Sequence, residues 1–281
     1  MIMKMHVIEG NTQQLDGGSM FGNAPKSLWM KWITPDANNR IPLACRCLLV
    51  QTNSDRLILF ETGIGTFFEP KLRERYGVQS EHALLKNLAL LGLKHTDIDA
   101  VVLSHLHFDH AGGMLSAYDE GPLKLLFPNA QYYVGKNHWA RAQNPHKREQ
   151  VSFIPLLHQL LIQSGRLHLV ETDHLEICGL KIHLRYSDGH TIGLMLAELE
   201  LESGPLVFVS DLVPGLPWVH LPIVMGYDRF PERTVDEKKE FYEYLLQRKG
   251  KLFFTHDPTV PCALLKQETD GKFFGEPIEG L

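Results

Sequence analysis

Residues 104–113, SHLHFDHAGG, place three histidines and one aspartate within six consecutive positions, His105 to His110. Imidazole and carboxylate groups are the ligands that zinc, manganese, iron and cobalt accept in proteins. His105 and His107 stand two apart on an extended loop and can point the same way, whereas Asp109 and His110 follow in the next turn. The pattern indicates a metal site rather than a polar turn that caps a helix. Gly112 and Gly113 are expected to allow a tight turn and to start a helix.

Three more residues of ligand type follow apolar strands later in the chain. His190 comes after LKIHLRYS, Asp211 after PLVFVS and His256 after KLFFT. Loops held by the edge of a rigid sheet can keep ligands in place before the metal binds. The candidate ligands are therefore His105, His107, Asp109, His110, His190, Asp211 and His256.

Hydrophobic periodicity predicts the elements that carry these loops. Alternating or continuous apolar runs predict strands, and apolar residues at helical spacing predict helices. Strands are expected over 43–50 and 56–61 as a hairpin, and over 100–104, 130–135, 166–170, 180–187, 194–201, 205–210 and 251–256. Helices are expected over 81–93, 136–142, 152–163 and 235–250, with the charged residues of DEKKEFYE on a solvated face.

Composition limits the class of protein. With 281 residues, 44% of them hydrophobic, the chain can bury a substantial core, and the absence of a linker-like stretch favours one domain over residues 1–281. A net charge of -5 without a basic run argues against nucleic acid as a partner. The N-terminus does not read as a signal peptide, and no apolar run approaches the roughly 18 residues of a membrane span. Four scattered cysteines fit a reduced, cytoplasmic protein with buried thiols.

The order His105-x-His107-x-Asp109-His110, His190, Asp211, His256 resembles the metallo-β-lactamase superfamily. The resemblance implies an α/β fold, an αββα sandwich of two mixed sheets packed face to face with helices outside. It also implies two divalent metal ions, zinc first and manganese, iron or cobalt as alternatives. One ion would take His105, His107 and His190, and the other Asp109, His110 and His256, with Asp211 as the bridge.

Further stretches resemble one branch of that superfamily, the quorum-quenching N-acyl homoserine lactonases and methyl parathion hydrolases. These stretches are LDGGSMFGNAPKSLW, DLVPGLPWVHLPIVMGYD and THDP. In the branch they surround the metal edge, so Met20, Phe21 and Trp218 are expected in the substrate pocket. Tyr227 is a candidate for binding the substrate carbonyl. Glu61 stands where the family commonly has an aspartate that supports the metal loop from behind the ligands.

The resemblance implies hydrolysis by metal-bound hydroxide, with Asp109 as ligand and proton shuttle. The expected substrate is a small apolar acyl lactone, because the loops offer apolar side chains and a single cation, Lys26. A phosphotriesterase or a thioesterase of glyoxalase II type is the enzymatic alternative. A metal-stabilised binding protein is the alternative outside enzymes. The related lactonases also make a homodimer an expectation.

Overall fold

The computed structural model describes residues 3–280, which form two compact units. The first unit contains residues 3–13 and 44–182, and the second contains residues 14–43 and 183–280. The division falls inside one strand, directly after Ile182. Each unit has a hydrophobic core of its own, and each is described separately below.

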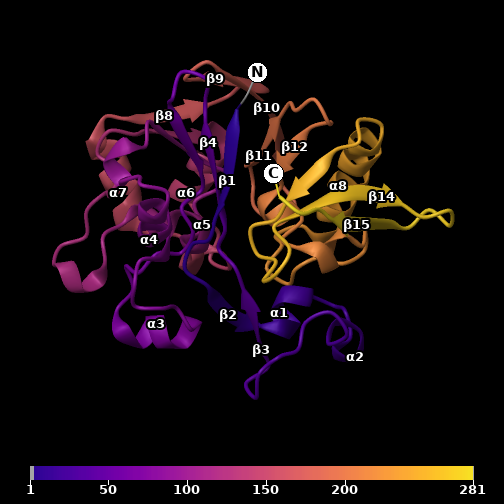
Figure 1. The fold of residues 1–281 in the computed structure, drawn as a ribbon. Coiled ribbons are helices and arrows are strands. Elements are labelled where there is room, and N and C mark those ends of the chain that lie inside the picture. The colour runs from indigo at the N-terminus through magenta and orange to yellow at the C-terminus, as the bar shows by residue number, and fades with distance from the viewer. Residues whose placement is uncertain (1–2, 281) are drawn as a thin grey trace. The chain divides into compact units, whose positions relative to one another are not determined.

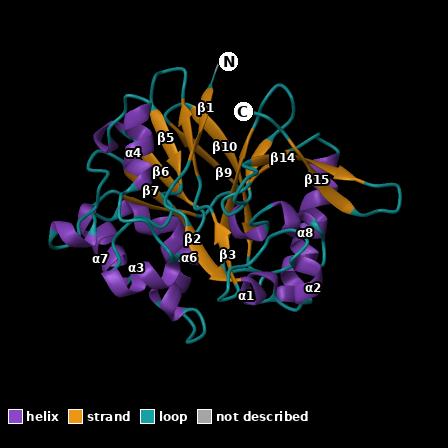
Figure 2. Ribbon diagram, turned by 60° about the horizontal axis from the view of Figure 1, so that its bottom comes forward, coloured by secondary structure: helices purple, strands orange, loops and turns teal. Residues whose placement is uncertain are grey.

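The first unit is built on a six-stranded sheet with the order β1-β4-β5-β6-β7-β8. Its strands are β1 (Lys4–Ile8), β4 (Cys47–Gln51), β5 (Leu57–Phe60), β6 (Ala100–Leu103), β7 (Gln131–Gly135) and β8 (Leu167–Val170). Its helices are α3 (Pro70–Tyr76), α4 (Ala83–Leu90), α5 (Phe108–Ala111), α6 (Lys136–Gln143) and α7 (Pro155–Ser164), and in Figure 2 α4, α6 and α7 accompany the strands of this sheet. Strands β5 to β8 run parallel, and all four residues of β6 are buried, as a central parallel strand requires.

The other large sheet has seven strands in the order β15-β14-β13-β12-β11-β10-β9. They are β9 (His174–Ile177), β10 (Leu180–Ser187), β11 (Leu194–Leu199), β12 (Leu206–Phe208), β13 (Lys251–Phe253), β14 (Cys262–Gln267) and β15 (Phe273–Pro277). A two-stranded sheet pairs β2 (Gln13–Asp16) with β3 (Arg40–Leu43), and the helices of the second unit are α1 (Gly17–Phe21), α2 (Lys26–Trp29) and α8 (Pro231–Leu246). Helix α8 contacts β14, and both can be followed in orange and yellow in Figure 1.

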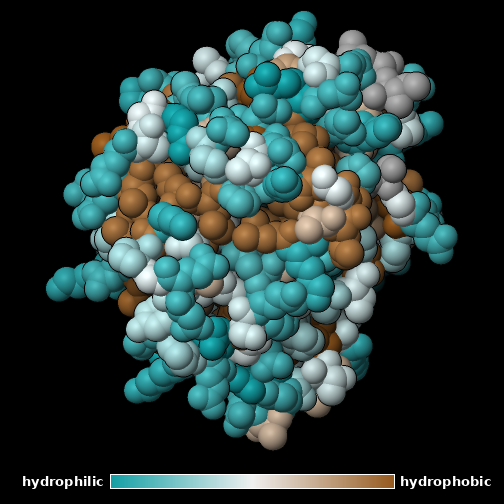
Figure 3. Space-filling model, turned by 60° about the vertical axis from the view of Figure 1, so that its left-hand side comes forward, coloured by the Kyte–Doolittle hydropathy of each residue, from teal (hydrophilic) through white to brown (hydrophobic). Residues whose placement is uncertain are grey.

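Short 3-10 turns complete the chain. They are η1 (His95–Asp97), η2 (Gly112–Met114), η3 (Tyr118–Glu120), η4 (Gln150–Ser152), η5 (Ser210–Leu212) and η6 (Leu216–Val219). Among the described helices, none combines the length and the apolar character that crossing a membrane requires. Figure 3 shows a band of apolar side chains on the face that it draws, and the first unit exposes Leu90, Val151 and Ile162.

Most elements expected from periodicity are present, including the hairpin of β4 and β5 and the helix α8. The solvated face predicted for DEKKEFYE is wrong at Lys238, which is completely buried. The helix expected to start at Gly112 and Gly113 is the single 3-10 turn η2, and α5 begins before it, at Phe108. Gly113 is also needed for a close approach, since a Cβ there would lie 1.9 Å from the carbonyl oxygen of Thr62. The cysteines are free as expected, but Cys178 is only half-buried.

Candidate metal centre

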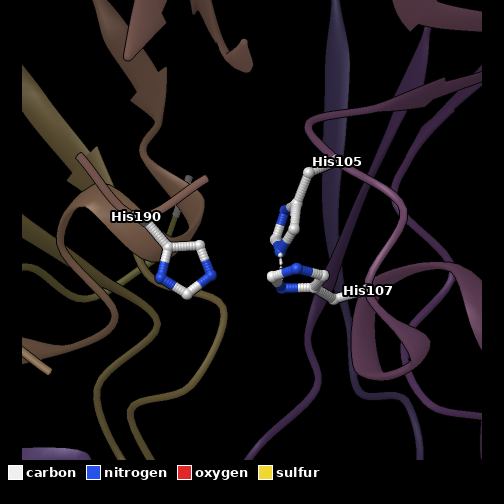
Figure 4. Close-up of side chains that lie close together, drawn as sticks. All are labelled: His105, His107 and His190. Carbon is white, nitrogen blue, oxygen red and sulfur yellow. Dashed lines mark hydrogen bonds between the residues drawn. The ribbon is translucent and has the colours of Figure 1, made fainter. Parts of the chain in front are cut away.

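In the first unit, the loop after β6 carries four of the predicted ligands. His105, His107 and His110 are buried, and Asp109 is nearly so, with 13% of its side chain exposed. The Nε2 atom of His105 lies 3.1 Å from Nδ1 of His107, and Figure 4 shows the two rings meeting at these atoms. The loop is anchored at both ends, because the parallel strands fix Leu103 and Thr62 N donates to the carbonyl oxygen of His110.

Glu61 supports two of these imidazoles from the end of β5. Its Oε2 lies 2.8 Å from Nδ1 of His110, and its Oε1 accepts a hydrogen bond from the hydroxyl group of Ser104. That hydroxyl oxygen lies 2.9 Å from Nδ1 of His105. Glu61 has a φ of 59°, a left-handed conformation that is costly for a residue with a side chain. The strained backbone aims one carboxylate at both rings.

Glu149 performs the same task for His107. Its Oε1 lies 3.3 Å from Nε2 of His107, and the guanidinium group of Arg141 holds the other oxygen at 2.6 Å from Nε and 2.5 Å from Nη2. The ring of Phe153 packs edge-on against His107, with ring centroids 5.0 Å apart. Asp109 is oriented from another direction, since Nε2 of Gln13 donates to its Oδ2 at 2.6 Å.

In the second unit, three strand ends bring together His190, Asp211 and His256. The two oxygens of Asp211 face different rings: Oδ2 lies 3.2 Å from Nε2 of His190, and Oδ1 lies 3.1 Å from Nε2 of His256. All three residues are buried. Ser210, directly before Asp211, has a φ of 43°, so this strand end is strained as well.

Two carboxylates hold the loop of His190. Oδ1 of Asp228 lies 2.9 Å from Nδ1 of the ring, which Figure 4 shows projecting from the loop after β10. Glu237 on α8 accepts hydrogen bonds from the Ser187 hydroxyl at 2.6 Å and from the backbone nitrogens of Asp188 and Gly189 at 3.0 and 3.1 Å.

The donor set of each unit fits a divalent metal ion. Two nitrogens bound at about 2.0–2.1 Å to the same tetrahedral zinc ion are about 3.3 Å apart, close to the separation between His105 and His107. A carboxylate with each oxygen against a different imidazole, as in Asp211, has the form of a bridge between two ions. The other ring nitrogens of His107, His110 and His190 face carboxylates, which fixes the tautomer that leaves the metal-facing nitrogen unprotonated.

The residues predicted for the substrate pocket lie in the core of the second unit. Met20, Phe21 and Trp218 are at most 2% exposed, and the rings of Phe21 and Trp218 stack with centroids 4.5 Å apart. Their role as a pocket wall stays a prediction. Tyr227 is 43% exposed, and its role in binding a substrate carbonyl also stays a prediction.

Sequence reasoning missed the residues that orient the ligands, apart from Glu61. Glu149 lies in a charged loop whose composition gives no sign of a buried partner. Asp228 stands in the MGYD stretch, but its contact with His190 joins residues far apart in the sequence. Glu237 and Lys238 belong to a helix whose charges resemble an ordinary solvated face.

The family model of the metallo-β-lactamase superfamily matches residues 40–256, and the chain belongs to this superfamily. That membership confirms the expected α/β fold class and makes the chain a metal-dependent hydrolase that binds divalent ions. Curated relatives agree with the class. The N-acyl homoserine lactonase of Bacillus cereus is 25% identical over 266 residues, which cover 88% of this chain and 90% of that protein. The N-acyl homoserine lactonase AiiB of Agrobacterium fabrum is 27% identical over 84% of this chain and 88% of its own length.

Solved structures give the same fold. A probable metal-dependent hydrolase from Staphylococcus aureus superposes with a TM-score of 0.85 at 27% identity and covers 99% of this chain and 98% of its own. AidC, a dizinc quorum-quenching lactonase solved with a product, superposes with a TM-score of 0.76 over 99% of this chain and 95% of its own. At 22% identity, the likeness to AidC concerns the fold alone.

Proposed function

We propose that the chain is a dinuclear metal-dependent lactonase that opens lactones of the N-acyl homoserine type. The observation that carries the dinuclear centre is Asp211, whose two oxygens face two different imidazoles at 3.1 and 3.2 Å. A ligand set for one ion would not need such an arrangement. The substrate class is supported by relatives named as lactonases over 84–88% of the chain.

In this proposal the ligands of the two units serve one pair of ions, divided as the family resemblance implies. One ion takes His105, His107 and His190. The other takes Asp109, His110 and His256, and Asp211 bridges them. Zinc is the proposed metal because imidazole and carboxylate ligands suit it, and manganese, iron and cobalt accept the same donors.

Divalent ions in such a site lower the pKa of water to about 7 and polarise an ester carbonyl. The side chains of the protein must then place the proton donor and hold it in one direction. The Gln13 amide holds Oδ2 of Asp109, so the carboxylate keeps a fixed direction. Asp109 is proposed to carry a proton to the ring oxygen as the C–O bond breaks, and one such transfer completes the opening because the alkoxide stays tethered. The Tyr227 hydroxyl is proposed to donate a hydrogen bond to the substrate carbonyl.

Three broader properties belong to the proposal. A homodimer is expected by analogy with lactonases. A cytoplasmic location and a single domain over residues 1–281 also stay predictions.

The substrate class is tested by one panel assayed on a single batch of metal-loaded protein. Acyl homoserine lactones of several chain lengths are compared with phosphotriesters, glutathione thioesters, β-lactams and phosphodiesters. We expect the highest kcat/KM for an acyl lactone, loss of activity on chelation and recovery when divalent metal is added. A tenfold or greater preference for any other class would overturn the lactonase proposal and leave the metal site intact. Metal binding without turnover of any substrate would favour the binding protein instead.

A further inference from the structure

Lys238 of α8 is completely buried, and its Nζ lies among four backbone carbonyl oxygens. The acceptors are the carbonyl groups of Trp218 at 2.6 Å, Ile223 at 2.9 Å, His220 at 3.1 Å and Leu221 at 3.2 Å. All belong to the segment 218–223, which begins inside the single turn η6 and has no helix or strand beyond Val219. Within the described part of the chain, no carboxylate lies at ion-pair distance from this Nζ.

Such a lysine is expensive to bury, because charged groups lose hydration that only good hydrogen bonds replace. The four carbonyl groups in turn depend on this amino group as a hydrogen-bond donor. Trp218 and Ile223 belong to the hydrophobic core of the second unit, so carbonyl oxygens there have little access to water. Removing the amino group would leave several converging carbonyl dipoles without their shared donor, which costs more than an exposed hydrogen bond.

The segment that Lys238 holds leads directly to residues proposed for the reaction. Beyond Ile223, Met225 N donates to Oδ2 of Asp228 at 3.2 Å, and Oδ1 of the same carboxylate lies 2.9 Å from Nδ1 of His190. Tyr227 lies between Met225 and Asp228 in the sequence. The segment 218–228 therefore transmits its position to one predicted metal ligand and to the predicted carbonyl-binding tyrosine.

The same stretch is fixed at two other points. Trp218 Nε1 donates to the carbonyl oxygen of Met20 at 2.9 Å, and Gly226 N donates to the carbonyl oxygen of Ser19 at 2.9 Å. These bonds tie the outer ends of the segment to α1. Lys238 is what holds its middle, since four carbonyl groups over six residues converge on one atom.

We propose that Lys238 is a positioning residue whose amino group fixes the segment 218–223, so that Asp228 orients His190 and Tyr227 faces the substrate. The inference rests on the proposed function, because it concerns how that reaction is served. It adds a role for a residue that has no contact with any predicted ligand of the metal ions.

The test compares Lys238→Met with Lys239→Met, a control at the exposed neighbouring position of the same helix. In Lys238→Met we expect amides of 218–228 to exchange with deuterium at least tenfold faster, while amides of β11 keep their protection. The variant should release metal to a chelator faster, and its KM for acyl lactones should rise more than its kcat falls. Lys238→Arg, which keeps a cation at the end of a long side chain, should recover part of each change.

Unchanged exchange in 218–228 would overturn the proposal, and so would faster exchange with metal release, KM and kcat all at wild-type values. If Lys238→Met does not fold, Lys238→Gln, whose shorter side chain offers two N–H donors to the four carbonyl groups, replaces it against the same control. Wild-type values for that variant in all readouts would overturn the proposal as well. Failure of the wild type on every lactone would overturn the proposed function alone, because exchange and metal release do not need a substrate.

Discussion

The first unit takes its four predicted ligands from six consecutive residues, whereas the second takes three ligands from the ends of three different strands. In the first unit one short loop sets the spacing, and Glu61 and Glu149 orient the rings. In the second unit His190, Asp211 and His256 follow β10, β12 and β13, and α8 contributes Glu237, which holds the loop of His190. A ligand cluster can therefore come from one short sequence motif, or from strand ends that only the tertiary structure brings together.

The largest effect is expected at Asp211, whose carboxylate faces both His190 and His256. In Asp211→Ala both His190 and His256 lose the carboxylate between them, so metal content and turnover should fall together. Turnover should fall by roughly 10³-fold or more, because metal ions supply several kcal/mol of transition-state stabilisation and about 1.4 kcal/mol corresponds to tenfold. Elemental analysis and kinetics on the same batch measure both.

The matched control for Asp211→Ala is Asp236→Ala, an exposed aspartate in the same unit. It should behave as wild type. Full metal content and full turnover in Asp211→Ala would remove Asp211 from the metal centre.

The next effect separates a ligand from a proton shuttle in the first unit. In Asp109→Asn the amide can still offer an oxygen to a metal ion but cannot carry a proton. Turnover should fall by roughly 10²–10⁴-fold, the usual contribution of a positioned acid or base, while metal content falls much less. Asp119→Asn, at an exposed position of the same unit, is the control. Equal losses of metal and turnover would mean that Asp109 is a ligand only.

A smaller effect is expected when the carboxylates behind the ligands are neutralised. Glu149→Gln in the first unit and Asp228→Asn in the second should each weaken metal affinity by about 10–100-fold, because each weakens the hold on one imidazole. Competition with a chelator measures the affinity. The exposed residues Glu171 and Asp270 supply the control variants Glu171→Gln and Asp270→Asn. Wild-type affinity in both test variants would mean that the ligand loops are rigid without these carboxylates.

The last effect concerns pH and Lys238 of α8, and it amounts to at most about tenfold in the unfolding equilibrium per pH unit. Burial lowers the pKa of Lys238 to about 7, and the negative charge of Asp228 opposes that change. The unfolded chain keeps the ordinary lysine pKa of about 10.4, so between pH 7 and 10 it binds a proton that the folded chain has lost. The free energy of unfolding of wild type should therefore rise relative to Lys238→Met by up to about 1.4 kcal/mol per pH unit in that window. If the free energies of unfolding of the two proteins changed with pH in parallel, the lowered pKa of Lys238 would be contradicted.

The sequence predicts the features that depend on neighbouring residues, and it does not predict the contacts between distant residues. The local motif from His105 to His110 and the apolar runs before His190, Asp211 and His256 are visible without a structure. So are most strands and helices, because their periodicity is a property of neighbouring residues. The orienting residues are not visible. Asp228 meets His190 across 38 positions, and Lys238 meets Trp218 across 20, so only tertiary packing brings them together.

Expectations about the pocket show the same limit. Met20, Phe21 and Trp218 are predicted from a resemblance of loops, yet their side chains pack in the core of the second unit. A large apolar residue in a loop can serve a core or a binding surface, and its sequence neighbours do not distinguish the two. The hairpin of β14 and β15 is missed because the C-terminal stretch has no strong alternation.

The proposed dinuclear centre requires two bound ions, because the division of seven ligands around Asp211 has no purpose with one. The decisive measurement is the metal content of wild-type protein purified without chelator and then saturated with zinc, with the excess removed, by elemental analysis against an independent protein concentration. We expect a value close to two ions per chain, together with lactone hydrolysis that disappears on chelation and returns as the second ion is restored. A firm value of one ion per chain in fully active protein would contradict the dinuclear centre.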